Sequence, residues 1–482
     1  MSLQLNDVHS QLNSTTVARI ERPTSLAALV AVVRQTRAAG DHISIAGGRH
    51  AMGGQQFSSG STHIDMTALN RVLATDEVQG LLHIEAGAEW PAMIAASHEM
   101  AFSPTQSWAI RQKQTGVDAV SLGGSISANA HGRGLLMQPL GDDIEELTLV
   151  NARGEIVICS RALNAELFSL VIGGYGLFGI IYSAKLRLTP RQRVTRVVDI
   201  IDLDDAMNAV FRRANEGCIY GDFQFVIDTN DDRFLRRGVF ACYKPVEAET
   251  AESQAADGTS DLSPDTWLKL LKLAHDDKRQ AFRLYSQHYL STDGNRYWAD
   301  SMQLSTYIPS YANFLEKTRS PAEIAAAPMT KETLVIGEHY VPRDQILAFM
   351  QRAGEILRTF ETEVIYGTIR AITRDTVSFL PWAKDDFACV IFNLRTPHTE
   401  AGLQRTADTF RALIDASNAL GGSFFLTYHR HASAAQVETA YPRFQQWLAL
   451  KNHYDPDGIF SSNWYAHYRD AFAAAAQSSI TK

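Results

Sequence analysis

The chain has 482 residues, 45% of them hydrophobic and 20% charged, a balance typical of a globular protein and not of a disordered or fibrous one. Its length favours two or more domains over a single core. A net charge of −8 and a pI near 6.0 provide no electrostatic basis for binding nucleic acid or an anionic membrane. A small-molecule substrate is therefore the expected partner, and the oligomeric state stays open.

The first predicted helix begins after Ser25 and ends at Gly40, with apolar residues on one face. Strands over residues 42–46 and 63–65 follow, separated by a glycine-rich loop. Strands and helices alternate from there to about residue 190.

A second mixed sheet is predicted from strand-like stretches at residues 221–227, 333–336 and 387–394. A polar, acidic surface insertion from residue 247 leads into an amphipathic helix at residues 267–274, and another helix is expected over residues 434–454. Together these elements predict an α+β fold with two domains.

Neither export nor membrane insertion is indicated. The first residues, MSLQLNDVHSQLNS, lack a basic stretch followed by an apolar one, and the four cysteines are widely spaced. We therefore expect a cytoplasmic protein without a metal site. Residues 167–184 approach the length of a membrane span, but glycines interrupt the run. It predicts a helix end, a turn and a buried strand.

The segment over residues 46–56, AGGRHAMGGQQ, places glycines on both sides of a histidine directly after a strand. Glycine allows backbone N–H groups to approach an anion closely, so the loop can wrap a pyrophosphate. A tight turn carrying a surface histidine would explain this segment alone equally well.

Two further loops favour a bound ligand over a tight turn. Residues 121–134, SLGGSISANAHGRG, offer small side chains beside which a planar ligand can lie, and residues 173–185, GGYGLFGIIYSAK, lead into a buried strand. Three such loops predict one extended dinucleotide. The Rossmann fingerprint GxGxxG after the first strand is missing.

With these loops the chain resembles FAD-binding oxidoreductases of the vanillyl-alcohol oxidase type, which share the p-cresol methylhydroxylase fold. The sequence GGRH at residues 47–50 is similar to the family loop whose histidine bonds to the 8α carbon of the flavin, so the resemblance implies FAD tethered through His50. Neutral imidazole is the nucleophile this bond needs. Residues 103–116 hold no cysteine for a second link.

The C-terminal part is similar to alditol oxidases, gulonolactone-type enzymes and decaprenylphosphoryl-ribose oxidases. The resemblance lies in Tyr441-Pro442-Arg443, Asp455-Pro456 and Phe460, in EHYVP at residues 338–342, and around Arg370. It implies that residues 1–190, completed by 425–482, bind FAD, and that residues 191–424 form a substrate-binding cap.

The resemblance also implies the residues that contact FAD. They are Ala46, Gly47, Gly48, Arg49, His50, Ala51, Gly54 and Gln55 in the first loop; Ser121, Gly123, Gly124, Ser127, Ala130, His131 and Gly132 in the second; Gly174, Gly179, Ile180 and Ile181 in the third; and Asn463 near the C-terminus.

The implied reaction is oxidation of a C–H bond in an alcohol, polyol or sugar-like molecule, with oxygen or another electron acceptor reoxidising the flavin. Arg370 would bind substrate oxygen or stabilise charge on the reduced flavin. Where sugar-oxidising relatives have a lysine, this chain has Tyr428, so Tyr428 and His429 are the candidate bases. Alternatives are an NADPH-dependent reductase of the same fold and a flavin-carrying protein without turnover. Ala130, before His131-Gly132, favours a dehydrogenase over an oxidase.

Overall fold

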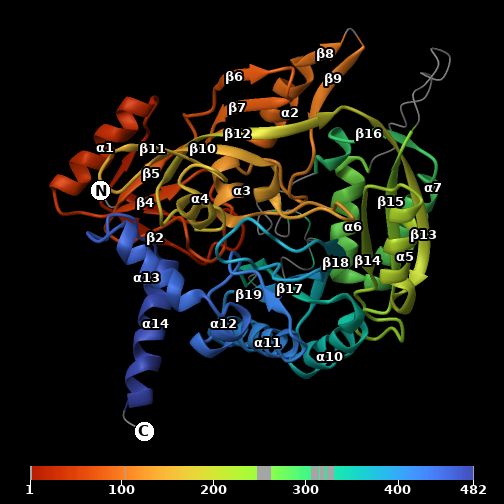
Figure 1. Cartoon of the computed structure of the whole chain (residues 1–482). Helices are drawn as coiled ribbons and strands as arrows, with labels where there is room; N and C mark the ends of the chain where they lie inside the picture. The colour runs from red at the N-terminus through yellow and green to blue at the C-terminus, as the bar shows by residue number, and fades with distance from the viewer. Residues whose placement is uncertain are drawn as a thin grey trace.

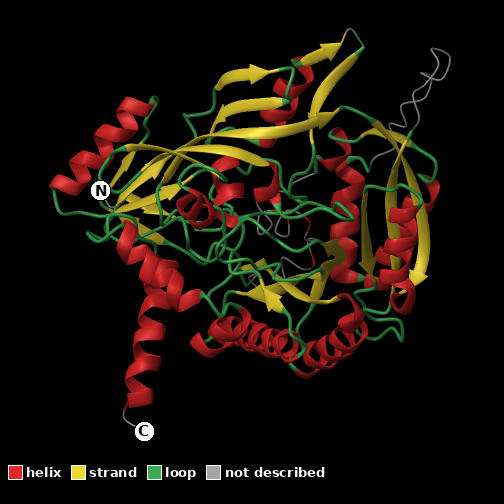
Figure 2. Cartoon of the chain, in the orientation of Figure 1, coloured by secondary structure: helices red, strands yellow, loops and turns green. Residues whose placement is uncertain are grey.

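The computed structural model describes residues 3–103, 105–246, 262–305 and 330–480, together with residues 314, 318, 320 and 322. Within these residues the strands form sheets of two, three, seven and eight strands. Figures 1 and 2 show the seven-stranded sheet in the upper left of the molecule and the eight-stranded sheet in the lower right, with helices around both. The α+β class predicted from the sequence is confirmed.

The first helix, α1 (Leu26–Ala38), begins and ends where the sequence predicts. The Ser25 hydroxyl accepts a hydrogen bond from the N–H of Ala28, which caps the helix, and Gly40 leaves it with a φ of 66°. Strand β4 (Ile43–Ala46) then pairs in parallel with β5 (Thr62–Asp65), and β5 also pairs with β3 (Arg19–Glu21). The loop over residues 47–61 therefore leaves the end of the edge strand β4 and leads into the central strand β5.

The seven-stranded sheet follows in the chain. Its strands are β6 (Val72–Asp76), β7 (Leu81–Glu85), β8 (Ala101–Ser103), β9 (Gln106–Ile110), β10 (Ile144–Val150), β11 (Ile156–Ser160) and β12 (Ile180–Pro190). The helices between them are α2 (Trp90–Glu99), α3 (Leu122–Ala128), η1 (Leu140–Asp143) and α4 (Ala165–Val171), while β1 (Leu3–Leu5) pairs with β2 (Thr15–Val17) at the N-terminus.

The glycine-rich run over residues 167–184 comprises the end of α4, a turn and the start of β12, as predicted. Gly173, Gly176 and Gly179 all have positive φ angles in this turn. Residues with a Cβ atom adopt such angles only at a cost in free energy. In the described part of the chain, none of the helices has the length and apolar character needed to cross a bilayer.

The eight-stranded sheet has the order β16-β13-β15-β14-β18-β19-β17-β20. Its strands are β13 (Arg193–Asp202), β14 (Tyr220–Phe225), β15 (Arg237–Pro245), β16 (Arg296–Trp298), β17 (Glu332–Pro342), β18 (Val364–Ile372), β19 (Phe387–Pro397) and β20 (Ser423–Phe424). The predicted strands at residues 221–227, 333–336 and 387–394 correspond to β14, β17 and β19. Every neighbouring pair is antiparallel.

Helices cover both faces of this sheet. One face packs against α5 (Leu203–Asn215), α10 (Ile346–Thr359) and α11 (Glu400–Ala419) in one hydrophobic core. On the other side, aromatic residues of α7 (Lys278–Ser291) pack against Val198, Val239 and Ala241. The predicted helix at residues 267–274 is part of α6 (Pro264–Asp276), and the polar insertion before it, residues 247–261, lies outside the described residues. Short helices η3 (Ser301–Gln303) and η4 (Arg343–Gln345) complete this part.

The prediction of a single helix over residues 434–454 is wrong, because this stretch forms two helices. Chain direction changes at Tyr441-Pro442-Arg443 between α12 (Ala434–Ala440) and α13 (Phe444–Tyr454), since proline cannot donate the hydrogen bond that would continue a helix. The break lets α13 and α14 (Asn463–Ile480) pack Trp447 and Trp464 into the core around β12.

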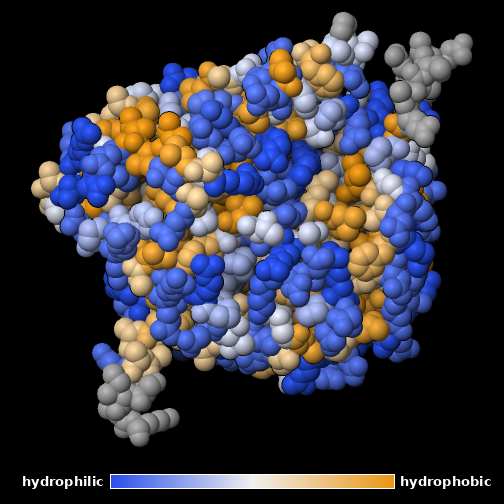
Figure 3. Space-filling view, viewed as in Figure 1, coloured by the Kyte–Doolittle hydropathy of each residue, from blue (hydrophilic) through white to orange (hydrophobic). Residues whose placement is uncertain are grey.

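The C-terminal segment also joins the three-stranded sheet, at β4. The N–H of Ile43 donates to Ile459 O at 2.6 Å, and the N–H of Ser461 donates to Ile43 O at 2.9 Å. In Figure 1 the blue C-terminal helices accordingly lie beside the red N-terminal elements. The molecular face in Figure 3 is mostly hydrophilic with smaller hydrophobic areas, as is ordinary for a globular protein.

Candidate active site

A cavity of about 620 Å³ lies between the loops of the N-terminal region and the eight-stranded sheet. One wall is made of loops rich in glycine and other small residues. The opposite wall is made of side chains from six neighbouring strands of this sheet and from α6 and α7. A ligand in this cavity would therefore contact backbone on one side and side chains on the other.

The three predicted loops meet at the first wall. The predicted cofactor residues that line it are Ala46, Gly47, Gly48, Arg49, His50, Ala51, Gln55, Ser121, Gly123, Gly124, Ser127, Ala130, His131, Gly179, Ile180 and Ile181. These residues come from three separate stretches of the chain, at positions 46–55, 121–131 and 179–181. Their convergence matches the expectation of one extended ligand.

Close contacts explain why the first loop needs glycine. A Cβ atom on Gly47 would lie 2.0 Å from Ser121 Oγ, and one on Gly48 would lie 2.3 Å from Ala119 O. Arg49 has a φ of 60°, so the backbone turns sharply there. Among the described residues, no oxygen accepts the backbone N–H groups of Gly47, Gly48 and Arg49. N–H groups so arranged form a cradle for an anion.

His50 lies in this wall with its ring held on two sides. Its Nε2 lies 2.9 Å from Ala119 O, and its Nδ1 lies 2.9 Å from Nε2 of His9. Burial lowers the pKa of His50, although the hydrogen bond to Ala119 raises it in part. The ring is therefore neutral near pH 7, which a nucleophilic imidazole requires.

Four predicted cofactor residues lie away from the cavity surface. Gly54, Gly132 and Gly174 are packing positions, where a Cβ would lie 2.9 Å from Asn13 Oδ1, 2.7 Å from Lys113 O and 2.0 Å from Leu170 O. The amide of Asn463 donates to Thr15 Oγ1 and accepts from the N–H of Ser59. These residues hold the loops in place and do not line the cavity, so their contact with the cofactor stays a prediction.

The second wall follows from strand geometry. Over part of β14, β18, β19 and β17, alternate residues face the cavity, because side chains alternate between the two faces of a sheet. The residues concerned are Asp222 and Gln224, Tyr366, Thr368 and Arg370, Ile391 and Asn393, and Leu334, Ile336 and Glu338. The residues between them, such as Phe223, Val335 and Phe392, belong to the core beneath the sheet.

Arg370 is a buried cation at the cavity edge. Its side chain is 8% exposed, and it donates hydrogen bonds to Thr115 Oγ1 and to Gly132 O. Its Nε has no hydrogen-bond partner among the described residues. Since burying an unsatisfied guanidinium group is costly, Arg370 is well placed to bind an oxygen atom of a ligand.

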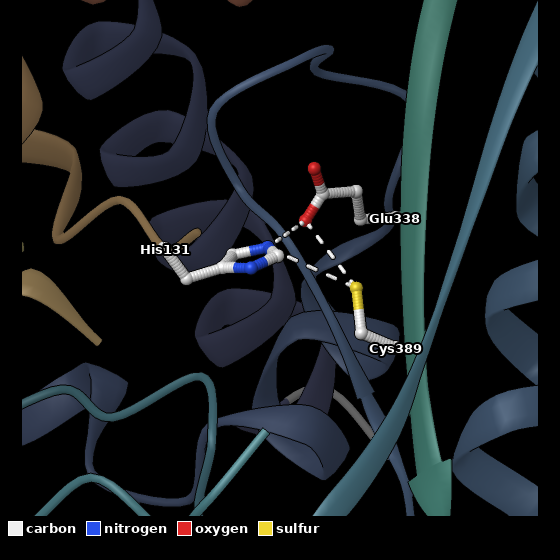
Figure 4. A group of neighbouring side chains, drawn as sticks. All are labelled: His131, Glu338 and Cys389. Carbon is white, nitrogen blue, oxygen red and sulfur yellow. Dashed lines mark hydrogen bonds and ion pairs between the residues drawn. The ribbon is translucent and has the colours of Figure 1, made fainter. Parts of the chain in front are cut away.

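Glu338 is the centre of a hydrogen-bond network that the sequence did not assign. Its carboxylate accepts hydrogen bonds from Tyr428 Oη at 2.9 Å, Tyr340 Oη at 2.7 Å and His131 Nε2 at 2.9 Å. Figure 4 shows His131 and Cys389 pointing toward Glu338 from different elements. The network ties the second loop to β17 and to the segment that carries Tyr428.

The contacts of His131 determine its charge. Its Nδ1 donates to Gly132 O at 3.0 Å and its Nε2 donates to Glu338, so both ring nitrogens carry protons and the pair is a buried ion pair. Burial alone would raise the pKa of Glu338, but the charge and hydrogen bonds of its neighbours outweigh burial and lower it to about 2. Glu338 is thus ionised at all ordinary pH values.

His131, Glu338 and Cys389 bring one nitrogen, one oxygen and one sulfur within 4.8 Å of one another, a set that could in principle ligate a metal. However, His131 Nε2 carries a proton, and burial raises the pKa of the Cys389 thiol well above its usual range. A metal needs the deprotonated forms of both ligands. The geometry is therefore that of a hydrogen-bond network.

The structure separates the two candidate bases. Tyr428 lines the cavity, and burial together with Glu338 raises its pKa well above 10, so its phenol keeps its proton. His429 does not line the cavity: its ring stacks on Phe410 and His431 at centroid distances of 4.3 and 4.9 Å. The structure therefore brings Tyr428 but not His429 to the cavity, and a role as base stays a prediction for both.

Aromatic side chains also line this cavity. Tyr243, Tyr285, Tyr289 and Tyr366 line it together with Asp222. Asp222 accepts hydrogen bonds from Gln224 Nε2 at 3.0 Å and Thr368 Oγ1 at 3.3 Å, and pairs with Arg133. The sequence alone did not indicate these residues, because they come from three strands and from α7, and the packing that brings these elements together is not encoded in any local pattern.

Comparison with known proteins agrees with this geometry. Residues 17–160 match a family model described as a FAD binding domain, and residues 334–468 match one described as D-arabinono-1,4-lactone oxidase. The chain is 23% identical to an L-gulono-1,4-lactone dehydrogenase of Mycobacterium tuberculosis over 446 residues, which cover 92% of this chain and 94% of the relative.

Other relatives match only part of the chain. Cytokinin dehydrogenase 2 of Arabidopsis thaliana is 31% identical over 147 residues, covering 30% of this chain and 28% of the relative. Cytokinin dehydrogenase 9 of Oryza sativa is 26% identical over 200 residues, covering 40% and 37%. The glycine loops that line the first wall fall in or just beyond the residues matched by the first family model, and β17, β18 and β19 fall in the second.

Proposed function

Because the chain belongs to the FAD-linked oxidoreductases with a p-cresol methylhydroxylase-type FAD-binding domain, we propose that it oxidises a C–H bond of an alcohol, a polyol or a sugar-like molecule. In this proposal residues 1–190 and 425–482 hold FAD, and residues 191–424 bind the substrate. The observation that carries it is the single cavity with a backbone wall on one side and Arg370, Tyr428 and Glu338 on the other.

The residues of the backbone wall fit FAD. The N–H groups of Gly47, Gly48 and Arg49 suit the pyrophosphate, and the small residues at positions 121–130 leave room for flat rings. Bound FAD supplies a two-electron acceptor for hydride from the substrate C–H bond.

We also propose that FAD is attached covalently to His50. The ring is neutral and lies in the cavity wall. In the sequence His50 stands two positions after Gly47-Gly48. To test this, the purified protein is denatured in acid and examined for bound yellow colour and for a mass increase of one FAD. His50→Ala should lose both, and release of all flavin from the wild-type protein would refute the tether.

On the substrate side, Arg370 holds the reacting oxygen through its unpartnered Nε. Tyr428 receives the hydroxyl proton on Oη while its own proton moves to Glu338, which lies 2.9 Å away. While it holds this proton Glu338 is neutral, so its ion pair with His131 forms again only when the proton has left the carboxyl group. Arg370 and Glu338 are both buried, which strengthens each electrostatic contact.

The test is anaerobic mixing of the enzyme with a panel of alcohols, polyols, sugars and lactones while the flavin absorbance near ~450 nm is recorded. Bleaching by hydroxylated donors is expected, and readmission of air then separates an oxidase from a dehydrogenase. Bleaching by NADPH alone, with no response to any hydroxylated donor, would overturn the proposal in favour of a reductase. Bound FAD that no donor reduces would indicate a protein without turnover.

A further inference from the structure

His9, in the N-terminal segment, contacts the proposed attachment residue directly. Its Nε2 lies 2.9 Å from Nδ1 of His50, and the two ring centroids are 5.0 Å apart. Both residues line the cavity. This contact between two imidazole rings gives His9 a direct influence on the position and protonation of His50.

The segment that carries His9 is built around one buried carboxylate. Asp7 is 2% exposed, and it accepts hydrogen bonds from the backbone N–H groups of His9, Ser10, Gln11 and Leu12. This turn is fastened to the glycine loop, since the N–H of Val8 donates to Arg49 O at 3.1 Å and Asn13 Nδ2 donates to Met52 O at 2.6 Å. His9 is thus held in place relative to His50.

The contacts of His50 decide which of its nitrogens can react. A carbonyl oxygen only accepts hydrogen bonds, so Nε2 of His50 carries the proton that it shares with Ala119 O. Burial and the neighbouring His50 lower the pKa of His9 to about 3, so both rings are neutral. His9 must then donate to Nδ1 of His50, and Nδ1 holds the lone pair.

Packing supports the same assignment. A Cβ atom on Gly48 would lie 2.7 Å from Cδ2 and 2.9 Å from Nε2 of His50, so this edge of the ring is covered by the loop itself. The Nδ1 edge faces His9. The edge left for reaction with the flavin is therefore the Nδ1 edge, which His9 contacts.

We propose that His9 is a positioning residue for flavin attachment: its hydrogen bond keeps Nδ1 of His50 unprotonated and aimed into the cavity until FAD takes its place. This inference rests on the proposed tether. One N–C bond forms, between Nδ1 and the 8α carbon, and one C–H bond of that carbon breaks. The two electrons of the C–H bond pass through the flavin to the enzyme's electron acceptor, and the proton passes to solvent. His50 keeps its Nε2 proton and becomes cationic.

The experiment uses full-length protein produced in riboflavin-starved cells and then mixed with FAD. The covalent fraction is followed over time by in-gel fluorescence after acid denaturation, and noncovalent binding is followed by quenching of free FAD. His9→Ala should bind FAD but attach it roughly 10- to 100-fold more slowly, since small losses of orientation at a reacting atom cost this much. His9→Gln, which can still donate to Nδ1, should recover part of the rate.

His42→Ala is the matched control, because His42 lies outside the cavity and its Nε2 contacts Ser59 O. It should attach FAD at the wild-type rate. Equal rates for His9→Ala and wild type would overturn the inference while leaving the tether intact. A wild-type protein that never attaches FAD would overturn the tether itself, so the two failures are distinguishable.

Discussion

The two walls of the cavity are built in different ways. On the glycine-loop wall the surface is largely backbone, and a single added methyl group collides with a neighbouring loop. On the eight-stranded wall the surface is a row of alternating side chains, from Asp222 to Glu338, on a regular sheet. The first wall is specified by the absence of side chains and the second by their identity.

This difference teaches how the enzyme can keep one ligand and vary another. A backbone cradle tolerates few substitutions, so it suits a cofactor of fixed shape. Side chains on a rigid sheet can change without moving the sheet, so the second wall suits substrate recognition. Substitutions should accordingly remove the cofactor on the first wall and spare it on the second.

The largest effect is expected for Gly48→Ala. Its new Cβ would lie 2.3 Å from Ala119 O, which must displace the loop at a cost of about 1–3 kcal/mol and close the cradle. The purified variant should contain little flavin by absorbance. Gly354→Ala is the control, because a Cβ atom added to Gly354, in α10, would lie 3.6 Å from the nearest neighbouring atom. Normal flavin content in Gly48→Ala would mean that the backbone wall is not the cofactor wall.

Glu338→Gln should destabilise the fold by roughly 3–5 kcal/mol, because it leaves the His131 charge buried without its partner. The pKa of Glu338 is lowered from 4.5 to about 2. Its ionised form therefore stabilises the wild-type protein above pH ~4.5 by about 3 kcal/mol, and this contribution is lost as pH falls toward ~2. Melting curves at several pH values should show the variant and wild type converging in acid. A constant difference down to the lowest pH would disprove the ion pair.

Arg370→Ala should slow flavin reduction by substrate roughly 10²- to 10³-fold, the loss typical of removing one electrostatic donor, while FAD content stays normal. Stopped-flow absorbance measures the rate. Arg374→Ala serves as the control, since Arg374 is exposed two positions beyond the end of β18. Loss of FAD along with the rate would show that the two walls are not separable.

The smallest effect is expected for Tyr428→Phe. Removing the hydroxyl deletes one of the hydrogen bonds to Glu338, so reduction should slow roughly 10- to 100-fold and stability should fall by about 1–2 kcal/mol. Tyr454→Phe, which removes a hydrogen bond to exposed Glu166, is the matched control. Identical reduction rates for both variants would exclude Tyr428 from proton transfer.

The first wall could be predicted from sequence because its signals are local. Each loop carries its own cluster of glycines after a strand or before a helix, and His50 lies within one of them. Arg370 and Tyr428 were found through resemblance. Proline at position 442 also carries a local signal, but the wider helical pattern concealed the break.

Most of the second wall could not be predicted. Asp222 and Glu338 lie on strands more than a hundred residues apart, and they share a face only because β18 and β19 lie between β14 and β17. Such order depends on long-range packing, which no local pattern records. His9 escaped notice for the same reason, since a turn around Asp7 brings it to a loop some forty residues later.

The hydrogen bonds between Ile43 and residues 459–461 bear on how the protein is made. Residues 459–461 follow β4, the strand that carries Ile43, by more than 400 positions, so a growing chain contains the strand and its glycine loop long before the residues that brace the strand. The loop is also held by Leu426, whose carbonyl oxygen accepts a hydrogen bond from Gln55 Nε2 at 2.8 Å. We therefore expect the glycine loop to take its final shape only after residues 426–461 have been made and have folded against it.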